Sequence, residues 1–199
     1  MTIIYNVCTI IGQQIQIHQK KKVIKYAFDF AFEYYNHGIG RLYLHHLDFL
    51  LFVGKYDHLQ CVQSYWTAKS IPSGQTELHL DEFTGLVNWI STKNNYVVEE
   101  FLEKRIAVAK VINDAYNLAY VHYGVVQEKG FSEFQFLDFV GKDITNELLV
   151  YHYWIANHIP PKNRGNIFFK EFADLVNLII FKRYDLIKFI NKRMEKISS

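Results

Sequence analysis

The side chains best suited to acid–base chemistry in this sequence are its nine histidines. One of them, His46, follows Arg41 with four residues in between. An arginine can hold a phosphate through two parallel hydrogen bonds, and a histidine can move a proton at neutral pH because its ordinary pKa is about 6.5. Arg41 and His46 are therefore the predicted catalytic residues if the chain cleaves a phosphodiester.

The segment that holds this pair, Arg41-Leu42-Tyr43-Leu44-His45-His46, resembles the motif of the HEPN ribonucleases, in which an Arg precedes a His by a short spacer. The resemblance implies a helical, metal-independent ribonuclease in which Arg41 holds the scissile phosphate and His46 moves a proton. It extends over six residues, and Leu42 stands where the family often has a polar residue. We therefore treat the ribonuclease as an alternative function.

Other catalytic signatures are missing from the sequence. It contains no HExxH motif, no Glu-x-x-His pair, no GxSxG elbow, no P-loop and no GxGxxG motif. These patterns supply most zinc, diiron, serine-nucleophile and nucleotide sites. We therefore predict no metal site and no cofactor, and we expect that the chain is not an enzyme.

Two basic clusters are candidate surfaces for nucleic acid or for an acidic partner. The first follows the apolar N-terminal run and the second lies near the C-terminus: Lys20, Lys21 and Lys22, and Lys188, Lys192 and Arg193. A net charge of +2 is too small to indicate a polyanion partner by itself. We expect these cations to face solvent and to interact with helix dipoles.

Composition predicts a globular, helix-rich protein. Half of the 199 residues are apolar and 17% are aromatic, whereas only three are proline and ten are glycine. Aromatic rings bury large areas and can build a substantial core. No apolar run reaches the roughly 20 residues of a membrane span, and the two cysteines form no disulfide framework. We therefore expect an all-α, single-domain protein over residues 1–199, cytoplasmic and with buried free thiols.

The N-terminal segment 2–35 is predicted to form one long helix. Mostly apolar positions follow alternating steps of four and three residues, which is the heptad pattern of a helix that packs lengthwise on a partner. They are Ile3, Val7, Ile10, Gln14, Ile17, Lys21, Ile24, Phe28, Ala31 and Tyr35, and the polar Gln14 and Lys21 interrupt this heptad stripe. Such a helix suits association, within the fold or with a second copy. The alternative is a short β-hairpin around Gly12, since residues 2–11 are rich in β-branched side chains.

Seven or eight helices are predicted, arranged as a compact bundle with short connections. Helical periodicity follows the N-terminal helix at residues 42–53, at 57–66, from Thr76 to about 93, at 96–123, after a Ser132 cap, at 147–158 with a Thr145 cap, and from Asn166 onward with a break near 184–185.

The function that these features favour is a non-catalytic binding or regulatory protein, because amphipathic helices and rings are abundant and no polar constellation accompanies them. It would act on another protein or on a second copy of itself. A small-molecule sensor with a pocket lined by Trp66, Trp89 and Trp154 is a further alternative. The Lys-, Ile-, Asn- and Tyr-rich composition is typical of an AT-rich genome, so an accessory role in bacterial or viral host–virus conflict is the expected setting.

Overall fold

A computed structural model of the chain describes residues 2–35, 43–72, 77–125, 130–159, 167–180 and 185–198, with α1 side chains from Gln13 onward. These residues are mostly helical, which confirms the all-α prediction. No helix among them is long and apolar enough to cross a membrane.

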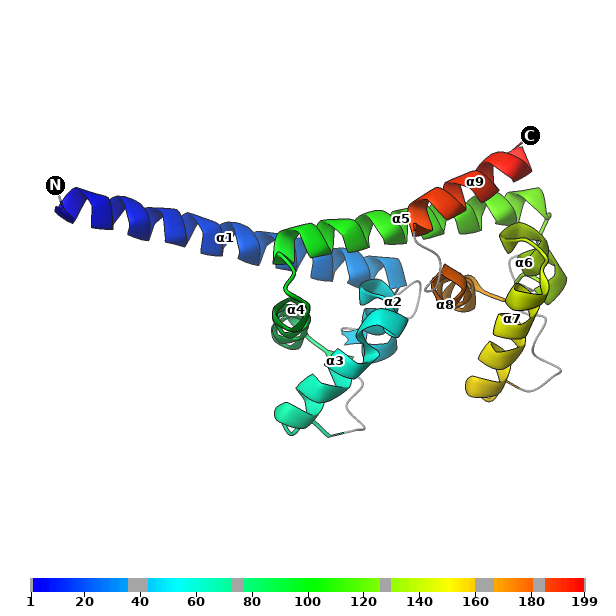
Figure 1. Ribbon diagram of the computed structural model, residues 1–199, viewed down its shortest axis with the longest axis horizontal. Helices are drawn as coiled ribbons and strands as arrows, with labels where there is room; N and C mark the ends of the chain where they lie inside the picture. The colour runs from blue at the N-terminus through cyan, green and yellow to red at the C-terminus, as the bar shows by residue number, and fades with distance from the viewer. Residues whose placement is uncertain are drawn as a thin grey trace. The chain divides into compact units, whose positions relative to one another are not determined.

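Nine α-helices and one two-stranded sheet make up the described part of the chain (Figure 1). Several helices begin a few residues away from their predicted starts, and the predicted start at Asn166 lies outside the described residues. In order, the elements are α1 (Thr2–Tyr35), β1 (Leu44–His45), α2 (His46–Val53), α3 (Lys55–Ala68), β2 (Glu77–Leu78), α4 (Leu80–Asn94), α5 (Val98–His122), α6 (Glu133–Val140), α7 (Ile144–Ala156), α8 (Phe169–Ile180) and α9 (Leu186–Ser198).

The chain divides into two compact units. The first comprises Met1–Phe52 and His58–Ile106, and the second comprises Val53–Asp57 and Ala107–Ser199. Each unit has its own apolar interior, so each is described by itself. Whether residues 1–199 unfold together as a single domain stays a prediction.

The long N-terminal helix is confirmed, because α1 continues through Gly12, where the hairpin alternative would turn. Tertiary contacts bury only part of the predicted heptad stripe of α1. Every side chain from Gln13 to Gln19 is exposed, and Ile17 is 56% exposed. The buried α1 positions begin further along, at Ile24, Ala27, Ala31 and Tyr35. The second half of this heptad stripe therefore packs within the first unit.

Phe83 of α4 lies at the centre of the first unit. Its ring meets Phe28 of α1 at 5.4 Å, Phe49 of α2 at 5.3 Å and Phe52 of α2 at 6.1 Å between centroids. The pairs with Phe28 and Phe49 are edge-to-face, and such pairs add roughly 0.5–1.5 kcal/mol each beyond area burial. These contacts fix α1, α2 and α4 against one another.

A small antiparallel sheet corrects two helix predictions in this unit. Residues 42–53 were expected to be helical throughout, but Leu44 and His45 pair with Leu78 and Glu77, so α2 begins at His46. The same pairing moves the start of α4 from Thr76 to Leu80. Leu44 and Leu78 are buried, and burial of this pair favours the strands over a longer helix.

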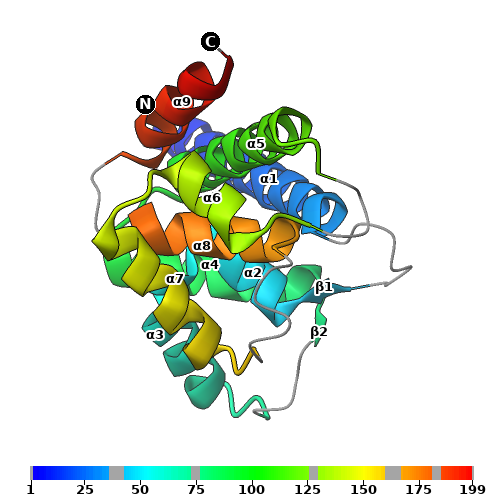
Figure 2. The same cartoon turned by 90° about the vertical axis from the view of Figure 1, so that its right-hand side faces the viewer.

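The second unit packs around Phe172 of α8. Its ring contacts Tyr116 at 5.3 Å, Phe136 and Phe139 at 5.5 Å each, and Phe131 at 5.7 Å between centroids. Helix α8 contacts α7 and α9, and α6 contacts the same two helices (Figure 2). Tyr116 belongs to α5, Phe136 and Phe139 belong to α6, and Phe131 precedes α6, so residues from three segments meet on this one ring of α8.

Helix caps set where α6 and α7 begin. The Ser132 hydroxyl accepts a hydrogen bond from the Gln135 amide at 3.2 Å, which confirms the predicted cap of α6. Thr145 does not cap α7: Asp143 Oδ1 accepts from the Asn146 amide at 2.8 Å, because Asp143 has the extended backbone that an N-cap requires. Helix α7 therefore starts at Ile144, and Thr145 lies in its first turn.

Candidate functional site

The predicted Arg41–His46 pair is described only in part, because Arg41 lies outside the described residues. His46 is the first residue of α2 and is half-buried. Its ring lies 4.6 Å from that of His45 and meets Trp66 edge-to-face at 5.6 Å. One side of the imidazole is therefore covered by other rings rather than open to a substrate.

The surroundings of His46 hold its pKa below the ordinary histidine value. Burial is the main cause, the neighbouring His45 adds to it, and the Asp48 carboxylate opposes it. Nδ1 of His46 is buried and has no hydrogen-bond partner among the described residues. A neutral imidazole that can accept a proton fits acid–base chemistry, but it equally fits a core histidine held by Trp66.

The first basic cluster lies on α1, just N-terminal to the buried positions of that helix. Lys21 and Lys22 are exposed and Lys20 is half-buried. One turn further along the helix, Lys25 pairs with Asp29 at 2.6 Å. Exposed ion pairs of this kind contribute little to stability. Lys21 and Lys22 present their cations to solvent, and a role of this cluster in binding stays a prediction.

The second basic cluster lies on α9, and its three residues differ in their surroundings. Lys188 and Lys192 are exposed and one helical turn apart. Arg193 is partly buried, and its guanidinium lies 5.2 Å from the centroid of the Phe189 ring. It also packs so close to Gly141 that a methyl group at that position would clash with it. Arg193 therefore takes part in packing, and the two lysines carry the exposed charge.

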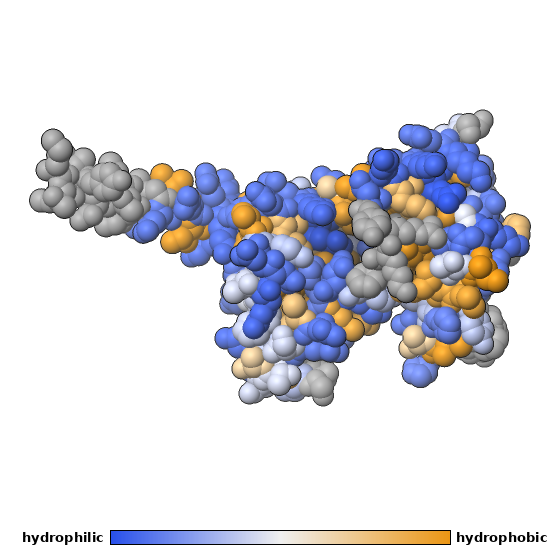
Figure 3. Space-filling model, viewed as in Figure 1, coloured by the Kyte–Doolittle hydropathy of each residue, from blue (hydrophilic) through white to orange (hydrophobic). Residues whose placement is uncertain are grey.

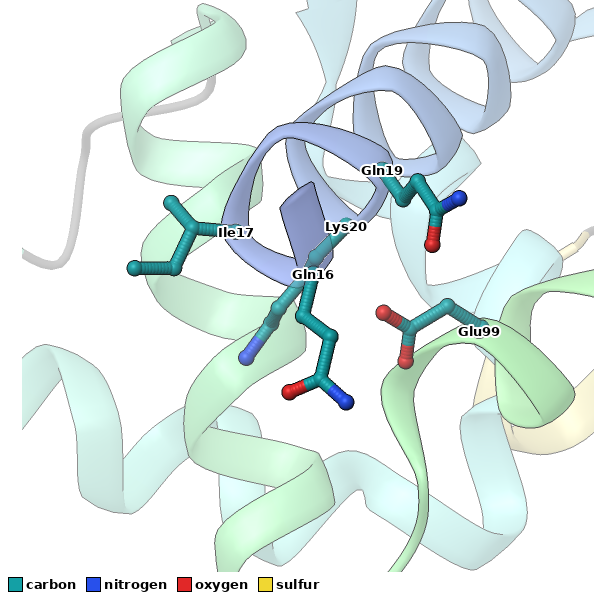
Figure 4. Close-up of a pocket in the computed structure, with 5 residues that line it drawn as sticks. All are labelled: Gln16, Ile17, Gln19, Lys20 and Glu99. Atoms are coloured by element: carbon teal, nitrogen blue, oxygen red, sulfur yellow. The ribbon is translucent and has the colours of Figure 1, made fainter. Parts of the chain in front are cut away.

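A cavity of about 450 Å³ lies in the first unit, lined by Gln16, Ile17, Gln19, Lys20 and Glu99. In Figure 4 the glutamines of α1 and Glu99 of α5 face the same space, and Ile17 projects from the other side of α1. No ring lines this cavity. It is therefore not the aromatic pocket that a small-molecule sensor would require.

The tryptophans lie in separate surroundings. Trp66 packs on His46, and Trp89 donates its indole hydrogen to the Ser64 hydroxyl at 3.1 Å. Trp154 is buried in the second unit and donates to Glu133 at 2.9 Å. Each indole thus has a structural contact of its own.

Cys61 corrects the expectation of buried thiols. It is a free thiol but only half-buried, and its sulfur accepts from the side-chain amide of Asn94 at 3.7 Å. The side chain of Cys8 lies outside the described residues.

A buried polar cluster in the second unit centres on Asp174 of α8. Its carboxylate pairs with the Lys55 ammonium at 3.2 Å, with 9% of the aspartate side chain and 22% of the lysine side chain exposed. The phenols of Tyr56 and Tyr153 also interact with this carboxylate. Burial, followed by the charge of Asp174, raises the pKa of both phenols far above the ordinary tyrosine value.

This cluster has the composition of an internal ion pair rather than of a catalytic centre. Phenols with such raised pKa values remain protonated and can only donate to the carboxylate. The charges of Lys55 and Asp174 compensate each other, which is how proteins tolerate buried charge. No group of three or more His, Cys, Asp or Glu side chains that could hold a metal ion occurs in the described part of the chain.

The second unit carries an apolar stripe along one exposed face of α7, which we call the α7 stripe. Its members follow steps of four, three and four residues and are strongly exposed: Ile144 at 75%, Leu148 at 52%, Tyr151 at 50% and Ile155 at 47%. Figure 3 shows hydrophobic surface gathered over α6 and α7. The opposite face of the helix, with Val150, Tyr153 and Trp154, is buried.

Sequence reasoning missed the Lys55–Asp174 pair and the α7 stripe for different reasons. Lys55 and Asp174 lie 119 positions apart, and no local pattern links them. The α7 stripe was visible as spacing, since 144, 148, 151 and 155 share one helix face. Two apolar faces compete on this helix, however, and the sequence does not say which one the fold buries.

Comparisons with protein-family models, with curated proteins and with solved structures gave no match. The functional argument therefore depends on the surface and interior of this chain alone.

Proposed function

We propose that the chain is a non-catalytic helical binding protein that acts by contact between an exposed helix face and another protein chain. The observation that supports this most strongly is the α7 stripe. Four large apolar side chains, each about half exposed or more, line three turns of one helix. Monomeric proteins rarely leave such a contiguous apolar face uncovered, and where they do, it commonly marks a binding surface.

The composition of α7 favours a protein partner over a membrane or a nucleic acid. Its 13 residues include no lysine and no arginine, and Glu147 is its one carboxylate. Helices that lie on membranes carry basic side chains on their polar face, and nucleic-acid surfaces need cations to neutralise phosphates. An apolar helix face without cations suits the groove or helix of another protein.

The exposed part of α1 is a second candidate contact. Positions 13–19 include no Lys, Arg, Asp or Glu, and Ile15 and Ile17 are 52% and 56% exposed. This leaves the predicted association role of the N-terminal helix as a proposal, with a smaller apolar surface than that of α7. An accessory protein in host–virus conflict would act in this way, by occupying a surface on its target.

Photo-cross-linking tests the proposal for a protein partner of any sequence. Benzoylphenylalanine replaces Tyr151 in the stripe, and in a matched control it replaces Ala156, which is exposed on the same helix outside the stripe. We expect protein adducts from the Tyr151 position and none from the Ala156 position when the full chain is irradiated in cells. Equal yields at both positions, or no adduct at either, would refute a specific contact through α7.

A further inference from the structure

The polar residues that flank the α7 stripe point to the identity of its partner. With about 100° between successive residues, Glu147 and His152 lie about 70° from the centre of the stripe, on opposite sides. In heptad terms the stripe occupies the a and d positions, and these two residues occupy the adjacent g and e positions. One edge of the stripe therefore carries a carboxylate and the other an imidazole that can form a hydrogen bond with it.

We propose that the α7 stripe binds the α7 stripe of a second copy of this chain, with the two helices parallel. In that arrangement a g residue faces the e residue five positions further along the partner helix. Glu147 of each copy then faces His152 of the other, so the contact is formed twice across the two-fold axis. This inference deepens the proposed function, on which it rests, by naming the partner chain.

The antiparallel arrangement is less favourable because it brings like groups together. When two helices run in opposite directions, g residues lie beside g residues and e residues beside e residues. The two Glu147 carboxylates would then share one edge and the two His152 rings the other. Like charges across such a pair destabilise it, so the placement of Glu147 and His152 selects the parallel form.

The stripe also has the size and composition of a modest self-complementary contact. From Ile144 to Ile155 it is about 16 Å long at 1.5 Å per residue, and none of its four side chains is charged. In a two-fold dimer the same patch lies on both copies. A helix pair of this length buries less than the roughly 800 Å² per partner of a standard interface, so we expect a dimer with a Kd in the micromolar range.

Charge exchange tests the pairing in the full chain. Sedimentation equilibrium over a concentration series measures the dimer Kd of Glu147→Lys, of His152→Glu and of the double variant. We expect each single change to raise the Kd about tenfold, because Glu147→Lys removes the acid that faces His152 and His152→Glu places two carboxylates opposite each other, in both cases twice per dimer. The double variant restores the opposite-charge pairs and should return the Kd to within about threefold of the wild-type value.

Disulfide trapping tests the direction of the helices independently. Ile155→Cys should form a disulfide-linked dimer on mild oxidation, since a parallel pair places residue 155 beside its own copy. The wild-type chain measures the background from Cys8 and Cys61. A dimer that cross-links only when Ile144→Cys and Ile155→Cys chains are mixed would overturn the parallel assignment.

Two outcomes separate this inference from the proposed function. A chain that stays monomeric at all concentrations, with cross-links from Tyr151 to a different protein, overturns the self-pairing and leaves the proposed function standing. A dimer whose Kd is unchanged by the charge variants, but is raised by Ile15→Gln with Ile17→Gln on α1, overturns the inference and assigns self-association to α1.

Discussion

The ion pair between Lys55 and Asp174 allows a quantitative prediction about the interior of the second unit. Lys55→Met removes the ammonium and leaves the Asp174 carboxylate with 9% of its side chain exposed and with the Tyr56 and Tyr153 phenols still interacting with it. Asp174→Asn removes the charge but keeps an oxygen that can accept from the phenols. The lysine that remains is 22% exposed and can extend toward water.

These geometries predict unequal losses of stability. Removal of one partner from a buried pair costs about 3–5 kcal/mol, and because the two phenols still interact with Asp174 we expect the lower end, about 3 kcal/mol, for Lys55→Met. For Asp174→Asn we expect about 1 kcal/mol. The double variant removes the orphaned charge, so it should be more stable than Lys55→Met alone, at a loss of roughly 1–2 kcal/mol.

Fluorescence of Trp154 provides the assay, because this residue is buried in the second unit. With the other two tryptophans replaced by phenylalanine, thermal unfolding reports on this unit alone. A loss of about 3 kcal/mol should lower Tm by roughly 6–12 °C in a chain of this size. If Asp174→Asn further destabilises the Lys55→Met variant, the electrostatic account of this cluster is wrong.

Three further predictions concern two glycines, the Glu171 carboxyl and the Arg41–His46 pair. Gly124 and Gly130 both have positive φ, but a methyl group on Gly130 would lie 2.9 Å from the Ile167 carbonyl oxygen, whereas nothing lies within 4 Å at Gly124. We expect Gly124→Ala to cost about 1 kcal/mol and Gly130→Ala to destabilise the second unit by at least about 1 kcal/mol more. Urea unfolding measures both losses. Burial is the main cause that raises the pKa of Glu171, so the folded chain binds the proton of this carboxyl more tightly than the unfolded chain does. Stability therefore falls as pH rises from the unfolded pKa of about 4.3 through the folded pKa. Glu171→Gln should remove this part of the pH dependence of Tm. The wild-type chain and an Arg41→Ala, His46→Ala variant should leave a labelled RNA equally intact, and cleavage that only the wild type performs would establish the ribonuclease instead.

The helices could be predicted from the sequence because their burial patterns are local. The α5 stripe through Ile112, Ala115 and Ala119 is buried as its spacing indicates, and Ser132 caps α6 because the cap needs only the next three residues. Predictions were wrong where a distant segment competed. The β1–β2 pairing joins Leu44 to Leu78 across 34 positions, and no local periodicity reveals it.

The candidate binding surface was only half predictable. Heptad spacing on the N-terminal helix indicated an association element, yet tertiary contacts bury its second half at Ile24 and Ala31. On α7 the same kind of spacing belongs to a face that the fold leaves exposed. Periodicity identifies an apolar face, and only packing decides whether the fold itself or a partner covers it.

Sedimentation equilibrium of the Leu148→Glu variant tests the central claim most directly. Leu148 is 52% exposed in the middle of the α7 stripe, so a charge there should disturb the contact without disturbing the fold; Ala156→Glu places the same charge on the exposed side of α7 outside the stripe. The account predicts that the wild-type chain and Ala156→Glu form dimers at micromolar concentrations and that Leu148→Glu raises the Kd at least tenfold with unchanged helicity. Equal association of all three chains would contradict it.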